Sequence, residues 1–118
     1  LKRVKLMEKN NYESIALISR TENEAKDITE NLTNLGLEVQ NISLNNEIYN
    51  GGICSITSEL SKGLEFDAVI LTDASEEKYN SNNETDMKNL YVSMTRPLHE
   101  LEILYQTDLT KPLQKLKK

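Results

Sequence analysis

The sequence predicts an α/β domain with a mostly parallel sheet and helices on both faces of that sheet. Short apolar runs alternate with amphipathic segments, and the first run is apolar at every position. Uninterrupted apolar runs are typical of strands that are covered on both faces. Strands that alternate with helices at this spacing indicate a parallel arrangement.

The first two elements are a strand at 15–18 and the helix that follows it. Thr21 and Glu24 have the spacing of a capping box and therefore mark the start of the helix. Gly36 supplies its stop. The residues that recur at helical spacing between these signals are Ala25, Ile28, Leu32 and Leu35.

The remaining segments continue the alternation. Strands are expected at 37–43, 53–57, 68–72 and 100–105. A helix is expected at 86–96, and the polar stretch 75–86 before it is expected to be a mobile surface loop. The residues that this second helix should bury are Met87, Leu90, Tyr91 and Met94.

The chain has 118 residues, a formal net charge of −5 and a single cysteine, Cys54. This length predicts one domain, 1–118, and the start at Leu1 with both ends resembling connections predicts a fragment of a longer protein. The single cysteine excludes an internal disulfide and indicates a cytoplasmic setting. No apolar run suits a membrane span, so no membrane partner is expected. The negative charge excludes bulk attraction to phosphate backbones, so nucleic-acid contacts must be local.

The stretch SKGLEFDAVILTD, 61–73, places three unusual residues directly before a buried strand. Glu65 alternates with two apolar neighbours, so its carboxylate should face away from them. Gly63 permits a backbone conformation or a close approach that a side chain would prevent. A carboxylate here suits a ribose hydroxyl, and Lys62 suits a phosphate. A surface salt bridge beside a turn glycine is the alternative, and composition alone favours it.

Arg20 and Arg96 stand at the ends of predicted elements. Arg20 closes the first strand, and Arg96 precedes Pro97, which disfavours helical geometry at the residue before it. We therefore expect Arg96 in the last turn of its helix. Arginine offers a planar fork of donors and a permanent charge, which suit a terminal phosphate. We expect both arginines to point toward one shared rim of the sheet, with a solvated cation as the alternative for each.

Three stretches together resemble known motifs: IALISRTENEA, ITSELSKGLEFDAVILTD and NLYVSMTRPLHELEILY. They resemble the fourth, fifth and sixth motifs of superfamily 1, UvrD-like DNA helicases, with a leaning to HelD-type relatives, which associate with RNA polymerase. The resemblance implies the C-terminal, second motor domain, with a three-layer RecA-like fold akin to P-loop NTPases. Its implied partners are the first RecA-like motor domain, single-stranded or duplex DNA and, for HelD-type relatives, RNA polymerase.

The resemblance also implies roles for individual residues. Arg20 resembles the fourth-motif arginine that reaches the γ-phosphate, and Arg96 resembles the sixth-motif arginine finger. Glu65 resembles the glutamate that binds the ribose, and Gly63 the turn glycine beside it. The implied cofactors are ATP and Mg²⁺, with the metal ligated mainly by the first motor domain. The positions that match fifth-motif residues near the nucleic acid and the coupling loop are Thr57 and Lys62.

The chain departs from the family pattern at two positions, and it has no room between Asn31 and Cys54 for the large insertion that UvrD-like proteins carry between the fourth and fifth motifs. UvrD-type members carry a histidine where this chain has Glu59, and a glycine where it has Ser93-Met94. A carboxylate in place of a DNA-facing histidine argues against ordinary single-strand binding. The sequence contains no GxxxxGK[ST] phosphate loop, so we expect it to contribute half of an ATP site and to be inactive alone.

Three functions stay open on this basis. The first is the second motor domain of an ATP-driven helicase or translocase, and the second is a HelD-type ATPase domain that remodels RNA polymerase. The third is a non-catalytic α/β interaction module, which the joint presence of Arg20, Glu65 and Arg96 disfavours. Cys54 is expected in the core, and His99 has no ligating neighbours in sequence, so no metal site is expected.

Overall fold

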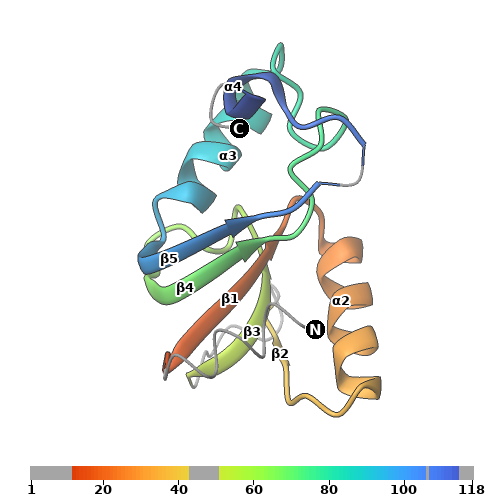
Figure 1. The fold of residues 1–118 in the computed structure, drawn as a ribbon, viewed down its shortest axis with the longest axis vertical. Helices are drawn as coiled ribbons and strands as arrows, with labels where there is room; N and C mark the ends of the chain where they lie inside the picture. The colour runs from red at the N-terminus through yellow and green to blue at the C-terminus, as the bar shows by residue number, and fades with distance from the viewer. Residues whose placement is uncertain (1–11, 43–50, 106, 115–118) are drawn as a thin grey trace.

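The sheet contains five parallel strands in the order β2-β3-β1-β4-β5, which confirms the predicted class (Figure 1). The computed structural model describes residues 12–42, 51–105 and 107–114. No helix in these ranges is long and apolar enough to cross a membrane. The elements are β1 (Ser14–Ser19), α2 (Glu22–Asn34), β2 (Gln40–Asn41), β3 (Gly52–Thr57), β4 (Phe66–Leu71), α3 (Glu84–Met94), β5 (Pro97–Ile103) and α4 (Lys111–Gln114).

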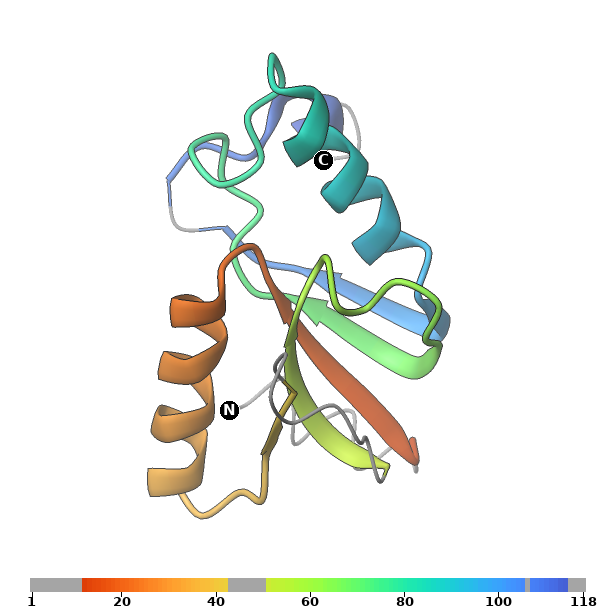
Figure 2. The ribbon, with the colours of Figure 1, turned by 180° about the vertical axis from the view of Figure 1, so that it is seen from behind.

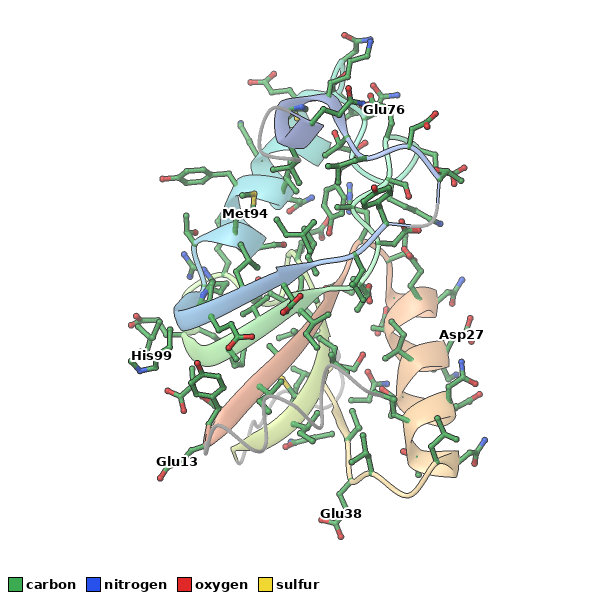
Figure 3. All side chains as sticks on the ribbon, in the orientation of Figure 1. Glu13, Asp27, Glu38, Glu76, Met94 and His99 are labelled. Atoms are coloured by element: carbon green, nitrogen blue, oxygen red, sulfur yellow. The ribbon has the colours of Figure 1, made fainter. Side chains whose placement is uncertain are left out.

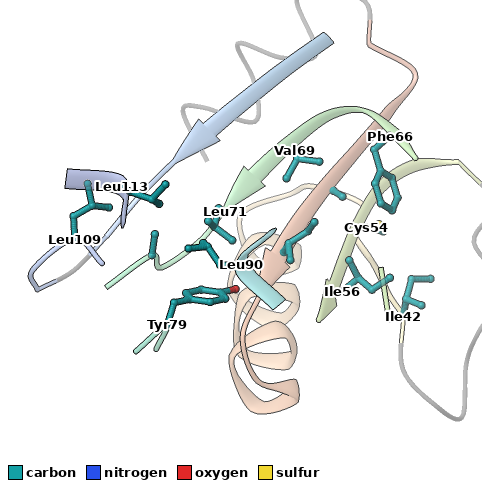
Figure 4. Close-up of a cluster of buried hydrophobic side chains, with 13 residues drawn as sticks. Ile42, Cys54, Ile56, Phe66, Val69, Leu71, Tyr79, Leu90, Leu109 and Leu113 are labelled. Atoms are coloured by element: carbon teal, nitrogen blue, oxygen red, sulfur yellow. The ribbon is translucent and has the colours of Figure 1, made fainter. Parts of the chain in front are cut away.

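Strand β1 is the central strand of the sheet, and the sheet is the middle one of three layers. It pairs with β3 on one side and with β4 on the other, and its side chains alternate between the two faces of the sheet. Helix α2 covers one face, and α3 and α4 lie on the other side (Figures 1 and 2). The buried cluster on the α2 side is Ile15, Leu17, Leu32, Ala68 and Ile70. The larger cluster, on the α3 side, includes Ile18, Ile56, Phe66, Val69, Leu71, Tyr79 and Leu90 (Figure 4).

Helix α2 begins at the predicted capping box. The backbone N–H of Glu24 donates to Thr21 Oγ1 at 3.3 Å, and the Glu24 carboxylate accepts from the Thr21 N–H at 3.2 Å. Gly36, with a φ of +97°, follows the helix as predicted. Of the four residues at helical spacing, Leu35 does not pack inward, because it is the C-cap residue and is 59% exposed.

The strands differ from the predicted ranges at their ends. Of the strand predicted at 37–43, only Gln40–Asn41 pairs with β3 as strand β2. The Ile42 N–H also donates to the Ser55 carbonyl at 3.0 Å. Position 43 of the predicted strand lies outside the described residues, as do both predicted connections at 1–11 and 115–118. Strand β5 begins at Pro97 rather than at 100, because the Phe66 N–H donates to the Arg96 carbonyl and draws the chain into the sheet there.

The segment 75–86, expected as a mobile surface loop, is irregular as far as the start of α3 at Glu84, and it is anchored to the domain by burial and hydrogen bonds. Tyr79 is fully buried, and the Glu76 carboxylate accepts from the backbone N–H groups of Ser81 at 2.6 Å and Lys111 at 2.9 Å. These hydrogen bonds, Ser81 first, lower the pKa of Glu76 to about 2. Figure 3 shows Glu76 close to α4. The polar groups of this segment bond one another and the start of α4, so a polar composition does not by itself indicate a detached loop.

Helix α3 follows this segment and buries a different set of residues from the one predicted. Leu90 is buried, and Met87 and Met94 pack against the core while partly exposed, as predicted. Tyr91 is 71% exposed, so the prediction that it packs inward is wrong. The described helix instead buries two polar residues, Asn89 and Ser93, and the Ser93 hydroxyl bonds the Ser58 hydroxyl inside the domain.

Candidate functional site

The residues singled out in the sequence lie at the two opposite ends of the parallel strands. We call the side of the sheet where the strands begin the amino edge, and the side where they end the carboxyl edge. Arg96 directly precedes β5 and Glu65 directly precedes β4, so both lie at the amino edge. Arg20 directly follows β1 and Thr57 ends β3, so both lie at the carboxyl edge.

Arg96 folds back over the end of α3. The helix ends at Met94 with Thr95 as C-cap, so Arg96 lies beyond the last turn in which it was expected, because Pro97 already begins β5. Its Nε donates to the Val92 carbonyl at 3.0 Å, and its Nη1 donates to the Leu64 carbonyl at 3.2 Å. Its Nη2 donates to Thr95 Oγ1 at 3.2 Å. These bonds occupy three of the five N–H donors of a guanidinium and leave two for a ligand.

The loop 58–65 brings three of the fifth-motif residues to the same edge: Lys62, Gly63 and Glu65. Gly63 has a φ of +85°, the left-handed region that glycine adopts without strain. A Cβ at this position would meet nothing within 4 Å, so the requirement for glycine is conformational rather than steric. Lys62 and Glu65 are both exposed. Arg96 bonds the carbonyl of Leu64, the residue directly before Glu65, so the guanidinium lies beside the Glu65 backbone.

Arg20 is held by two carboxylates at the carboxyl edge. Its Nε and Nη2 both lie 2.8 Å from Asp86 Oδ1, and its Nη1 lies 3.6 Å from Glu59 Oε1. The side chains of Arg20 and Asp86 are only 18% and 16% exposed, whereas that of Glu59 is 67% exposed. Arg20 therefore ties the end of β1 to the first turn of α3.

Thr57 and Arg20 line one small pocket of about 280 Å³. Thr57 Oγ1 accepts from the Leu60 N–H at 3.4 Å, which turns the chain away from β3. The other residues that line the pocket include two carboxylates, Glu22 and Glu59. The pocket therefore offers one engaged cation and two acidic side chains, a composition that disfavours a bare phosphate.

The two arginines do not share a rim, so that expectation is wrong. Arg20 follows a strand and Arg96 precedes one, which puts them at opposite edges of a parallel sheet. Their contact points on α3, Asp86 and Val92, are six residues apart, about 9 Å along a helix axis. In this arrangement the two guanidinium groups bond opposite ends of α3.

Comparison with known proteins was made by family model, by curated sequence and by solved structure. No family model matches the chain, and no curated protein matches it. The chain is similar to a crystal structure of the C-terminal domain of a possible DNA helicase from Lactobacillus plantarum WCFS1. The identity is 30% and the TM-score 0.78, and the match covers 95% of this chain and 67% of that one.

The chain belongs to this family of helicase C-terminal domains. Its five-stranded parallel α/β fold is consistent with a RecA-like domain. A motor-domain role in a helicase is the functional direction that this similarity supports.

Sequence reasoning missed Asp86 in this helicase C-terminal domain. Asp86 was treated only as the start of a helix, whereas it binds Arg20 and accepts from the Asn80 N–H at 3.2 Å. An acidic residue in the first turn of a helix was the available signal, but its partner lies 66 residues away in sequence.

The isolated cysteine and histidine have structural surroundings. Burial raises the pKa of the Cys54 thiol to about 12, so the thiol stays protonated in the core. His99, near the start of β5 in Figure 3, stacks on Tyr12 with ring centroids 6.1 Å apart and lies 3.9 Å from Asp67. Among the described residues, no group of three or more His, Cys, Asp or Glu side chains is arranged to hold a metal ion.

Proposed function

We propose that this helicase C-terminal domain is the second motor domain of an ATP-dependent superfamily 1, UvrD-like helicase or translocase. The observation that carries the proposal is the meeting of Arg96 with the loop 58–65 at the amino edge, beside Glu65. The Arg96 guanidinium keeps two N–H donors for a ligand there, and the exposed Glu65 carboxylate supplies acceptors. The amino edge would complete an ATP site shared with a first motor domain of the same polypeptide.

The residues of this edge fit the nucleotide. ATP would supply the phosphoryl group, and Mg²⁺ would be ligated mainly by the first motor domain, because this sequence carries no phosphate loop. Glu65 would accept hydrogen bonds from the ribose hydroxyls, with Gly63 shaping the turn beside it. Arg96 would direct its two remaining donors at the negative charge that develops on the transferred group.

The carboxyl edge would serve nucleic acid and coupling. Thr57, at the end of β3, is the proposed nucleic-acid contact. Lys62, within the loop 58–65 that follows, is the proposed coupling residue between that contact and the nucleotide. The γ-phosphate contact proposed for Arg20 would require its ion pair with Asp86 to open when the motor domains close.

One observation favours the HelD-type alternative, in which the domain remodels RNA polymerase and nucleic acid is secondary. The pocket beside Thr57 is lined by Glu22 and Glu59, and carboxylates repel a phosphate backbone. Binding of the complete polypeptide to RNA polymerase, compared with its binding to single-stranded DNA at matched salt, separates the two proposals. Tighter binding to the DNA that weakens steeply with salt supports the helicase, and salt-tolerant binding to the polymerase alone supports the alternative.

Replacement of Arg96 tests the shared site. In the polypeptide that carries both motor domains, Arg96→Ala should lower single-turnover ATP hydrolysis by roughly 10³-fold or more at saturating ATP. Arg96→Lys should rescue it poorly, because a point-like ammonium lacks the fork. Lys88→Ala is the matched control, since Lys88 is an exposed cation on α3, the helix that ends just before Arg96, and is paired only loosely with Glu84 at 3.8 Å. Turnover of Arg96→Ala within a few-fold of the Lys88→Ala control would refute the proposal.

A further inference from the structure

We propose that a buried cluster of three hydroxyl groups, those of Ser58, Tyr79 and Ser93, holds Arg96 in place at the amino edge. Ser93 is then a positioning residue that acts through Arg96. Its consequence for turnover rests on the proposed function, whereas its effect on Arg96 is measurable in this chain by itself.

The cluster joins three separate segments of the chain. The Ser58 hydroxyl, from the loop 58–65, lies 2.9 Å from the Tyr79 hydroxyl and 2.8 Å from the Ser93 hydroxyl. Ser93 belongs to α3 and also lies 2.9 Å from the Asn89 carbonyl. All three hydroxyl-bearing residues are fully buried, with 0% of their surface exposed. Figure 4 shows the Tyr79 hydroxyl at the core beside Leu90.

This cluster and Arg96 fasten α3 to the same loop at both ends of that loop. Ser93 bonds Ser58 at the start of the loop, and Arg96 bonds the Leu64 carbonyl near its end. The Arg96 N–H also donates to the Ser93 carbonyl at 3.4 Å, so the two fastenings are directly connected. Among the described residues, the Ser93 hydroxyl and the Arg96 guanidinium make the side-chain hydrogen bonds between the C-terminal end of α3 and this loop, so loss of the Ser93 hydroxyl leaves only that of Arg96.

Hydroxyl groups suit positioning better than apolar groups of the same size would. A buried hydroxyl without a partner costs free energy, so the cluster is stable only when all three segments keep their relative placement. Apolar contacts are non-directional and tolerate small shifts of one segment against another. A directional cluster next to the end of α3 therefore fixes the position of the Arg96 backbone, from which the guanidinium extends.

The test is hydrogen exchange of the Arg96 Nε–H, followed by NMR in the 118-residue chain. This N–H donates to the Val92 carbonyl at 3.0 Å, so its exchange reports the local geometry of Arg96. Ser93→Ala should speed the exchange roughly five- to tenfold, the effect of losing about one hydrogen bond. Ser61→Ala is the matched control: Ser61 is fully buried in the same loop, and its hydroxyl donates to the Ser58 carbonyl at 2.7 Å, within the loop.

Tyr79→Phe is the second variant, because it removes only the hydroxyl and keeps the ring in the core. It should speed the exchange in the same direction, and it decides the question if Ser93→Ala does not fold. Exchange that stays at the wild-type rate in the folded hydroxyl variants, or that rises equally in Ser61→Ala, overturns the proposal.

Turnover distinguishes this inference from the proposed function. In the polypeptide with both motor domains, Ser93→Ala should lower kcat for ATP and leave KM unchanged, because it displaces a group that acts in the transition state. If Arg96→Ala leaves turnover intact, the proposed function fails, while the exchange data still decide whether the cluster positions Arg96. If Arg96→Ala abolishes turnover and Ser93→Ala changes neither kcat nor the exchange, only the positioning role fails.

Discussion

The two arginines of the candidate site are held by chemically different partners. Arg20 lies against the carboxylates of Asp86 and Glu59, which neutralise its charge. Arg96 lies against the neutral carbonyls of Val92 and Leu64, which orient the guanidinium and leave its charge uncompensated by these contacts. A ligand-type arginine needs the second kind of support, because a phosphate competes poorly with a carboxylate that is already in place. At the residue scale, Arg96 is the better prepared of the two.

The pairing of Arg20 with Asp86 predicts a strong energetic coupling. In a double-mutant cycle, Arg20→Ala, Asp86→Ala and the double variant should show a coupling of about 2 kcal/mol in the free energy of unfolding. Both side chains are largely buried, so solvent screens the pair little. Denaturant unfolding measures this coupling, and additive effects of the two changes would show that the ion pair does not stabilise the fold.

Glu65 predicts a different kinetic signature from Arg96. If its carboxylate holds the ribose, Glu65→Ala in the complete polypeptide should raise KM for ATP more than it lowers kcat. The ribose contact is made alike in the ground and transition states, so its loss is a loss of uniform binding. Steady-state kinetics with Glu38→Ala, an exposed carboxylate elsewhere in the chain, provides the comparison. An unchanged KM would leave Glu65 as a surface carboxylate.

At the scale of elements, helix α3 owes its placement to the segments on either side of it. Tyr79 anchors the segment before α3 in the core, and the Thr110 hydroxyl donates to the Tyr79 carbonyl at 2.6 Å. Glu76 binds Ser81 in its own segment and Lys111 at the start of α4. The segment 75–83 is therefore bonded to the start of α4 and anchored in the core by Tyr79, directly before α3.

Glu76 predicts an acid-dependent loss of stability. Its folded pKa of about 2 lies below the ordinary value of 4.5, so its stabilising effect is complete above pH 4.5 and disappears as the pH falls toward 2. Glu76→Gln should lower stability at pH 7, and the difference from wild type should shrink between pH 4.5 and 2. Denaturation midpoints across this range measure the effect, with the exposed neighbour Glu77→Gln as control. A difference that stays constant down to pH 2 would contradict the role of the carboxylate.

At the scale of the whole molecule, the candidate residues lie at two opposite edges of the sheet. The amino edge carries Arg96 and Glu65, and the carboxyl edge carries Arg20 and Thr57. The loop 58–65 runs from the carboxyl end of β3 to the amino end of β4 and therefore connects them. The eight residues of this loop therefore link the two edges covalently.

A half-site predicts that the chain alone handles nucleotide poorly. We expect no measurable ATP hydrolysis by the 118-residue chain and at best millimolar affinity for ATP, the weak end of the affinity scale. Arg96 and Glu65 can add contacts but cannot replace a phosphate loop and its metal. Calorimetric titration measures this affinity, and micromolar binding would contradict the half-site.

The sequence by itself determined the parallel α/β class and most elements of the fold. Apolar runs, the capping box at Thr21 and the stop at Gly36 are local signals, and each acts within a few residues. The turn at Gly63 and the boundary at Pro97 were predicted in the same way, whereas the motif residues beside them were assigned by resemblance to helicase motifs. The roles proposed for Arg20, Glu65 and Arg96 stay predictions, because no contact with a ligand is present to test them.

Only the tertiary structure decided which of these residues meet. Arg20 and Arg96 both end elements in sequence, but one follows a strand and the other precedes one, so the parallel sheet separates them. The exposure of Tyr91 and the burial of Tyr79 were also beyond local reasoning, because both depend on contacts between distant segments. Burial and pairing are set by the three-dimensional arrangement of the whole chain, whereas helix caps and strand patterns are set by neighbours in sequence.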